Sequence, residues 1–304
     1  MAIRYLEHSK INKQAWDNCI QQSFNGIIYA YSWYLDVVCP NWEALVEDEY
    51  KSIMPLTKAV KYKFHYLYQP FFTQQLGVFS VDKLSEEKIN SFLQFIPEKY
   101  KFIEINLNTY NKFSSSNFEI KTSITYEMDL IKAYQNHYFQ YSENLCRNLK
   151  KAEKQKLEIS KEASAREIIN MFRQNRGRGI DTLKSKHYEI LEHLIHDAIG
   201  RGRGQIWGVK TRESKLCAGA FFVESNGKVI FLFSASNSHA KINGAMAFLI
   251  DRFIFENAQR NLVLDFEGSN DIGLGRFYNS FGAKKCLYLQ IRKNKLPLLV
   301  KWMK

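Results

Sequence analysis

Two carboxylates near the C-terminus are well placed in this sequence for acid–base chemistry. Asp265 and Glu267 lie two residues apart in the apolar run Leu262-Val-Leu-Asp-Phe-Glu. Side chains at i and i+2 of a strand point to the same face, so the two carboxylates are predicted to lie together, opposite Leu264 and Phe266. Either one is a candidate base that takes the proton of an attacking amine. Glu267 stands at the predicted strand end, where sites in open sheets form. The alternative is a structural pair that forms salt bridges or caps the next helix.

A tyrosine follows at a distance that suits a proton donor. Tyr278 lies four residues before Gly282 in the segment Phe277-Tyr-Asn-Ser-Phe-Gly. A phenol with a pKa of about 10 can protonate a departing thiolate with a pKa of about 8.5. The alternative, left open by the sequence, is a ring packed in the core with its hydroxyl bonded to the backbone.

An amphipathic helix before the carboxylates offers an anion site. Apolar residues at helical spacing predict one helix with a buried face: Ile242, Ala245, Met246, Leu249, Ile250, Phe253 and Ile254. The first N–H groups of a helix lack internal partners, and the helix dipole adds positive charge there, so a pyrophosphate or carboxylate fits this end. Gly244 allows a close approach to the backbone. The alternative is a helix start whose N–H groups bond water.

This succession of turn, helix, strand, short helix and closing glycine resembles the acyl-donor half of the GNAT-type acyltransferase fold. It resembles the FemAB-like branch more closely, in which two such domains stand in tandem. The resemblance implies an α+β fold of two GNAT-like domains, each a mixed, mostly antiparallel sheet flanked by helices. Residues 1–125 would form a degenerate acceptor-side domain, and residues 126–304 the domain that binds the acyl donor.

The resemblance also implies roles for individual residues. The donor would be acyl-CoA, held by Ser236, Lys241, Asn243, Gly244 and Ala245. Attack by the acceptor amine would be direct, with Asp265 or Glu267 receiving its proton and Tyr278 protonating the thiolate. In the Fem-type branch the donor is an aminoacyl-tRNA, so the tyrosine does not decide the donor.

Further substrate contacts are expected at two places. Arg147, Lys150, Lys151 and Lys154 form a basic stripe at i, i+3, i+4, i+7. Such stripes are usually solvated faces, but the surrounding segment, from Tyr141 to Ala152, resembles a Fem-type signature. That favours substrate binding by Arg147 and Lys150. In the first half of the chain, Gln69, Phe71 and Gln74 resemble the acceptor side of the family's cleft.

The elements that position these residues follow from periodicity and turn signals. Helices are predicted at residues 11–22, 32–38, 85–95, 142–156, 165–174 and 185–199, and strands at residues 27–30, 42–47, 52–58, 102–107, 157–160, 206–209, 216–223 and 229–235.

Composition and charge narrow the function further. The chain has 304 residues, which suggests two domains, and 45% hydrophobic residues, enough for full cores. Residues 1–120 carry 12 Lys/Arg and 13 Asp/Glu, whereas residues 121–304 carry 31 and 18. The excess positive charge of the second half favours an anionic ligand there.

Targeting and cysteine signals indicate an intracellular setting. The N-terminus lacks a signal-peptide core and no apolar run approaches a membrane span, which predicts a cytoplasmic protein. Five scattered cysteines argue against disulfides and against a metal site, so neither metal nor disulfide is expected.

Three functions remain open. The first is transfer of an acyl group from acyl-CoA to a small or peptide-like amine. The second keeps the fold but uses an aminoacyl-tRNA donor and a cell-wall precursor as acceptor. The third is a catalytically inactive double-GNAT protein that binds a nucleotide or a partner. The sequence indicates neither the acceptor nor the oligomeric state.

Overall fold

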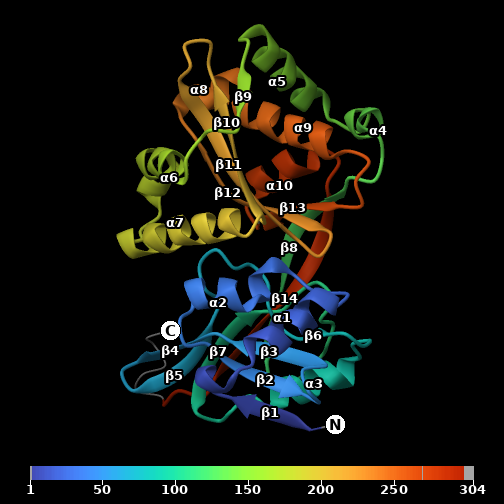
Figure 1. Cartoon of the computed structure of the whole chain (residues 1–304), viewed down its shortest axis with the longest axis vertical. Coiled ribbons are helices and arrows are strands. Elements are labelled where there is room, and N and C mark those ends of the chain that lie inside the picture. Colours follow the sequence, from blue (N-terminus) through green and yellow to red (C-terminus); the bar gives the residue numbers. More distant parts are fainter. Residues whose placement is uncertain (1, 269, 298–304) are drawn as a thin grey trace. The chain divides into compact units, whose positions relative to one another are not determined.

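The chain folds into two compact units, each built from strands and helices (Figure 1). The structure is a computed structural model that describes residues 2–268 and 270–297. Unit 1 comprises the residues up to Ile124 together with those from Cys286 onward, and unit 2 runs from Thr125 to Lys285. The division into domains at residues 125 and 126 stays a prediction from the sequence. The last strand, however, was expected in the second domain and groups with the first.

Among its described residues, unit 1 combines two sheets with three α-helices. Its elements are β1 (Ile3–Leu6), η1 (His8–Lys10), α1 (Lys13–Gln22), η2 (Ile28–Ala30), α2 (Ser32–Val38), β2 (Glu43–Glu47), β3 (Ser52–Leu56), β4 (Lys58–Lys61), β5 (Phe64–Tyr68), β6 (Phe79–Ser80), α3 (Glu86–Gln94), β7 (Tyr100–Asn106) and most of β14 (Lys284–Asn294). The segment 27–30, predicted as a strand, forms the short helix η2 instead.

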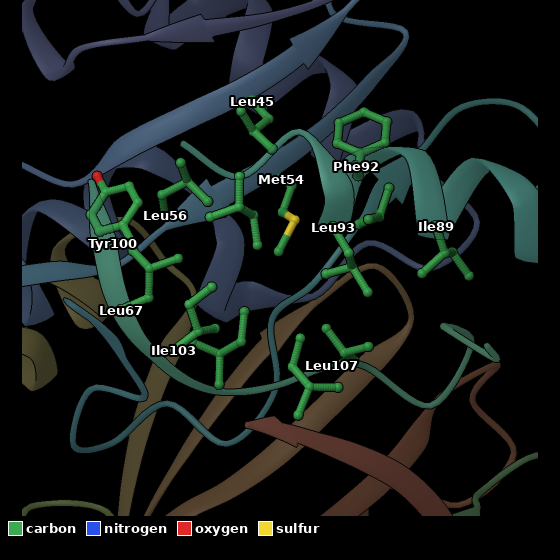
Figure 2. Close-up of a cluster of buried hydrophobic side chains, with 14 of the residues drawn as sticks. Leu45, Met54, Leu56, Leu67, Ile89, Phe92, Leu93, Tyr100, Ile103 and Leu107 are labelled. Atoms are coloured by element: carbon green, nitrogen blue, oxygen red, sulfur yellow. The ribbon is translucent and has the colours of Figure 1, made fainter. Parts of the chain in front are cut away.

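One sheet of unit 1 is antiparallel, in the order β1-β2-β3-β6. In the other, β4 pairs with β5 in antiparallel fashion, β5 runs parallel to β7, and β7 pairs with β14 in antiparallel fashion. Helix α3 makes the crossover between the two parallel strands. A shared core joins the layers, with Met54 of β3, Phe92 of α3 and Ile103 of β7 among its members (Figure 2).

A buried ionic cluster ties these strands together. Glu43 of β2 is 2% exposed. Its carboxylate accepts hydrogen bonds from Lys58 and Tyr100, and lies 2.9 Å from the ammonium of Lys99. Burial by itself raises the pKa of Glu43, but hydrogen bonds from Lys58, Tyr100, Tyr5 and Lys99 outweigh it and lower the pKa to about 2. The charged carboxylate therefore stabilises the folded unit.

Replacing this carboxylate is expected to make stability less dependent on pH. The pKa of Glu43 falls from 4.5 to about 2 on folding, so its contribution is present above pH 4.5 and is lost as the pH falls towards 2. We expect Glu43→Gln to lower the free energy of unfolding by about 3 kcal/mol at pH 7 and by almost nothing near pH 2. Denaturant unfolding between pH 2 and 7 measures this difference.

Glu49→Gln is the matched control, because the side chain of Glu49 is 90% exposed. It should leave stability nearly unchanged across the same range. An equal loss at pH 2 and pH 7 for Glu43→Gln would contradict the electrostatic explanation and leave a packing defect.

Unit 2 is built around one twisted sheet. It contains the end of β8 (Glu119–Asp129), then α4 (Tyr134–Tyr138), α5 (Glu143–Lys154), β9 (Glu158–Ser160), α6 (Ala165–Gln174), η3 (Arg176–Gly179), α7 (Ser185–Gly200), β10 (Gly204–Lys210), β11 (Leu216–Ser225), β12 (Lys228–Ser236), α8 (Ser238–Asn243), α9 (Ala245–Asn257), β13 (Val263–Gly268) and α10 (Ile272–Asn279).

Within this sheet the strand order is β8-β13-β12-β11-β10-β9. Neighbouring strands are antiparallel except β12 and β13, which are parallel. Helices α6 and α7 cover one face, and α5, α9 and α10 lie on the other (Figure 1). On the second face Phe253 of α9 stacks on Phe222 of β11, with ring centroids 3.8 Å apart. The predicted α+β class, with a mixed, mostly antiparallel sheet flanked by helices, is confirmed.

Local signals explain where several helices begin. Ser142 caps α5 by accepting from the Leu145 N–H, and Ser85 caps α3 in the same way. Ser164 and Glu167 form a reciprocal capping box at the start of α6, whose bounds match the predicted 165–174. Among the described residues, the helices are too short or too polar to cross a membrane.

Candidate functional site

The two parallel strands of unit 2 separate at their carboxyl ends. Their pairing runs from Lys228↔Val263 to Ile230↔Asp265. Beyond that point β12 continues to Ser236 and β13 to Gly268, and no further pairing joins them in the described part of the chain. The carboxyl ends of parallel strands, where they part, are the usual place for a site in an open sheet.

A bulge turns the end of β13. Asp265 pairs with Glu127 of β8, and the next pairing joins Gly268 to Thr125. Between these two pairs β13 advances by three residues and β8 by two, so β13 contains one extra residue. Glu267 absorbs the extra residue with φ +57°, a left-handed conformation that is uncommon for glutamate. The regular alternation expected of Asp265 and Glu267 is therefore broken at this point.

The carboxylate of Asp265 holds this bulge. One oxygen accepts from the Thr125 hydroxyl at 2.6 Å and from the Glu267 N–H at 2.9 Å. The other oxygen lies 3.6 Å from the ammonium of Lys228, which also donates to Glu127 at 2.6 Å. The cluster thereby joins strands β8, β12 and β13.

Burial sets the electrostatics of this cluster. Asp265 is 1% exposed, and burial raises its pKa above the ordinary value, against the opposing charge of Lys228. A carboxylate this deeply enclosed does not reach a substrate directly. Its hydrogen bond to the Glu267 N–H instead positions Glu267, which is only partly buried.

Tyr278 lies on the other face of the sheet. Its ring stacks on Phe266 at a centroid distance of 4.9 Å and lies 6.1 Å from the ring of Tyr126. Because Phe266 and Asp265 are consecutive in the strand, Tyr278 and Asp265 are on opposite faces. Burial raises the pKa of Tyr278 above 10, and the charge of Glu267 adds to that shift more than that of Asp265 does. The phenol therefore stays protonated at neutral pH.

The turn at Gly244 differs from the expected open helix end. Gly244, with φ +74°, separates α8 from α9, and Ile242, expected on a buried helix face, is 74% exposed. The Gly244 N–H donates to Ala240 O at 3.1 Å, and the Ala245 N–H donates to Asn243 Oδ1 at 3.0 Å. Two N–H groups expected to hold a pyrophosphate thus have partners within the chain.

The close approach expected at Gly244 is made by the protein itself. A Cβ added there would stand 2.4 Å from the carbonyl oxygen of Asn148 in α5. Glycine is required at this position for two reasons, its left-handed φ and its contact with a neighbouring helix.

A basic pocket of about 520 Å³ opens beside this turn. We call it the α5–α8 pocket; it is lined by Lys151, Lys154, Gln155, Lys156, Leu157, Thr211, Arg212, Glu213, His239, Ile242 and Asn243. Asn243 is the predicted donor-binding residue that lines it. Ser236 ends β12 opposite Ala218, and the side chain of Lys241 lies outside the described part of the structure.

Only part of the basic stripe of α5 lines this pocket. Lys151 and Lys154 line the α5–α8 pocket, whereas Arg147 and Lys150, the predicted substrate contacts, are exposed on α5 and do not line it. A face of α5 packs against α9. Which stripe residue reaches the pocket is set by that packing.

In unit 1 the predicted acceptor residues stabilise a loop. Gln69 donates to Thr73 O at 2.7 Å and accepts from the Asn106 N–H at 2.9 Å, and Gln74 O accepts from the Asn106 side chain at 2.8 Å. These bonds fasten residues 69–76 to β7. Phe71 is 41% exposed, whereas Gln69 and Gln74 are partly buried.

Sequence reasoning missed several members of these clusters. Thr125, Glu127 and Lys228 surround Asp265, yet they come from strands that are distant in sequence, and no local motif marks them. Lys156 and Arg212 stand in short turns between elements. Only their positive charge, in a half of the chain with excess Lys and Arg, gave a signal.

Comparisons with known proteins identify the fold. No protein-family model matches the sequence, and the search of curated proteins gave no match. Among solved structures, FemX aligns with a TM-score of 0.63 and 13% identity over 95% of this chain and 97% of its own. The chain has a FemX-like, GNAT-type fold. A conserved protein of unknown function from Bacteroides thetaiotaomicron aligns with a TM-score of 0.59 and 10% identity, over 93% of this chain and 97% of its own.

A third solved structure is also similar to this chain in fold. The C-terminal domain of a putative lysylphosphatidylglycerol synthetase from Agrobacterium fabrum aligns with a TM-score of 0.55 and 10% identity, over 93% of this chain and 91% of its own. These coverages include both units, so the tandem arrangement implied by the sequence resemblance is shown for the whole chain. The identities of 10–13% establish the fold and leave the substrate to chemical argument.

The Gly244 turn generates a stability prediction. We expect Gly244→Ala to lower the free energy of unfolding by about 3 kcal/mol, because the methyl group meets α5 and the φ is left-handed. Gly202→Ala is the matched control: its φ is +66°, with no atom within 4 Å of an added Cβ. It should lose only about 1 kcal/mol. Equal losses in denaturant unfolding would show that the α5 contact contributes nothing.

Proposed function

We propose that this protein transfers an acyl group from acyl-CoA to an amine. The observation that carries the proposal is the parting of β12 and β13 after Ile230 and Asp265, with Glu267 turned out by a bulge and Tyr278 stacked on Phe266 at the same place. The parted carboxyl ends of parallel strands are the usual place for a ligand in an open sheet, and the proposal places the thioester there. The transferase fold supports the reaction type.

The chemistry needs few protein groups. The amine nitrogen attacks the thioester carbonyl, the C–S bond breaks, and the amide forms. Glu267 takes the proton that the nitrogen loses, and the hydroxyl of Tyr278 gives a proton to the departing thiolate. No covalent enzyme intermediate is required, so the rate depends on holding the two substrates in the attacking geometry.

Asp265 acts in this scheme as a positioning residue. It touches no substrate, and its hydrogen bond to the Glu267 N–H maintains the left-handed turn that aims Glu267. Arg147 and Lys150 of α5 are the proposed contacts of the acceptor in unit 2. For Gln69, Phe71 and Gln74 of unit 1 the acceptor role stays a prediction from the sequence resemblance.

A second donor has its own support. The Gly244 and Ala245 N–H groups already have partners, and the excess positive charge lies in the second half of the chain. Both observations suit a donor recognised by charge over a wide surface, as an aminoacyl-tRNA would be. Lysylphosphatidylglycerol synthetase, by its name a lysine-transferring relative in fold, is consistent with that alternative.

A donor panel tests the reaction. The purified full chain is incubated with an amine panel and either acyl-CoA compounds or aminoacyl-tRNA, and thiol release or amide formation is measured. We expect turnover with acyl-CoA, and a loss of about a hundredfold or more in Glu267→Gln, which removes the base. Turnover with aminoacyl-tRNA alone would replace the donor assigned here.

Glu162→Gln is the control for that experiment, because its side chain is 88% exposed. It should keep wild-type turnover. Activity of Glu267→Gln equal to that of wild type would remove Glu267 from the mechanism. Absence of turnover with every donor, while the chain is folded, would favour the inactive binding protein.

Tyr278→Phe tests the proton donor. The substitution keeps the ring stacked on Phe266 and removes only the hydroxyl, so we expect kcat to fall about a hundredfold at neutral pH with donor affinity nearly unchanged. Because the pKa of Tyr278 is raised above 10, its deprotonation should not reduce wild-type turnover below pH 10. Steady-state kinetics across pH 6–10 measures both expectations.

Tyr126→Phe is the matched control, since its ring lies 6.1 Å from that of Tyr278 and in the same aromatic cluster. It should leave kcat within about twofold. A similar kcat for Tyr278→Phe and the control would leave Tyr278 as a packed aromatic.

A further inference from the structure

The α5–α8 pocket is a second site in unit 2, lined by neither Tyr278 nor the Asp265 cluster. We propose that it binds the phosphate groups of a nucleoside phosphate, with the base against Ile242. The inference rests on the proposed function only in expecting that this nucleotide belongs to the acyl donor. The binding itself follows from the charges and surfaces of the pocket.

The charge balance of the lining is one-sided. Lys151, Lys154, Lys156 and Arg212 face a single carboxylate, Glu213. That carboxylate accepts from the hydroxyl of Thr211 at 2.8 Å. None of the four cations forms an ion pair with any residue the structure describes.

Lys150, Lys186 and Lys215 of unit 2 likewise form no ion pair among the described residues, so the pocket differs from them in gathering its cations in one place. Three further lysines do have carboxylate partners. Lys161, Lys210 and Lys228 each form an ion pair with a carboxylate of the same unit. Unpaired cations gathered in one concave place raise the local potential and favour an anion there. Phosphate oxygens form strong, charge-assisted hydrogen bonds with ammonium and guanidinium groups.

A simpler explanation covers only part of this lining. Lysines in the last turn of a helix stabilise its dipole, and Lys151 and Lys154 stand in the last turn of α5. Lys156 lies beyond the helix, and Arg212 comes from the turn between β10 and β11. Their convergence with His239 of α8 on one pocket has no explanation in the helix dipole.

The apolar part of the lining specifies more than an isolated phosphate. Ile242 is 74% exposed at the wall of this cationic pocket, and Leu157, which also lines it, is buried. A large apolar side chain at the wall of a charged pocket is suited to the flat face of a base. A volume of about 520 Å³ is in the range of small-molecule sites.

Lys156 allows binding and folding to be tested separately. It follows α5 with φ +50°, a left-handed position where glycine is the preferred residue. Lys156→Gly is therefore expected to raise stability while it removes one charge from the pocket. Few substitutions in a binding site combine these two opposite effects.

The experiment titrates the purified full chain with ADP, adenosine and inorganic phosphate by calorimetry. We expect ADP to bind at least tenfold more tightly than either of its parts. Lys156→Gly and Lys154→Ala should each weaken ADP about tenfold. Ile242→Ser should weaken ADP and leave inorganic phosphate unchanged. Lys186→Ala, an exposed lysine of α7, should bind ADP as wild type does.

Three outcomes would overturn the proposal. They are unchanged ADP binding in Lys156→Gly and Lys154→Ala, an equal loss in Lys186→Ala, and a single-stranded RNA that binds this pocket while ADP does not. The proposed reaction fails separately: ADP binding that depends on the pocket, in a chain that turns over no acyl donor, supports this site and removes the acyltransferase.

Discussion

The buried carboxylate of Asp265 is the constraint on which the centre of unit 2 depends. It accepts from Thr125 of β8 and from the backbone of Glu267, and it lies beside Lys228 of β12. A carboxylate enclosed in protein is tolerated only when its oxygens are hydrogen-bonded and its charge is balanced. Because the partners come from three strands, meeting this requirement fixes how those strands lie and where β13 bulges.

The bulge connects this stabilising interaction to the proposed chemistry. It forces Glu267 into a left-handed conformation, and such strain persists only where surrounding contacts determine it. The same strand presents Phe266 to the face opposite Asp265, where Tyr278 stacks upon it. One short segment of β13 therefore positions Glu267, the proposed base, and supplies through Phe266 the surface on which the ring of Tyr278 packs.

Close packing of helices has a comparable consequence at the far end of β12. Gly244 lets the backbone of α5 approach the turn between α8 and α9. The N–H groups of Gly244 and Ala245, where an anion was expected, have partners within the turn, and Lys151 and Lys154 of α5 line the same pocket as His239. The basic side chains of this region therefore lie around the α5–α8 pocket, and the positive site that was predicted at the start of α9 is not open to a ligand.

What the sequence determined by itself is local. The capping serines, the apolar periodicity of α6 and the alternation of β7 each predicted an element close to its observed bounds, because neighbouring residues supply their hydrogen bonds and buried faces. The order of elements likewise carried the resemblance to a tandem fold, which the structural comparisons confirm.

Only the tertiary structure decided the rest. The apolar segment 27–30, predicted as a strand, forms the short helix η2. The C-terminal strand β14, predicted in the second domain, pairs with β7 of unit 1. The face of Glu267, the closed turn at Gly244 and the convergence of Lys156 with Arg212 depend on partners far away in sequence. The local sequence pattern does not specify which distant strand or helix packs against a given element. It therefore determines the elements but not the site that they form together.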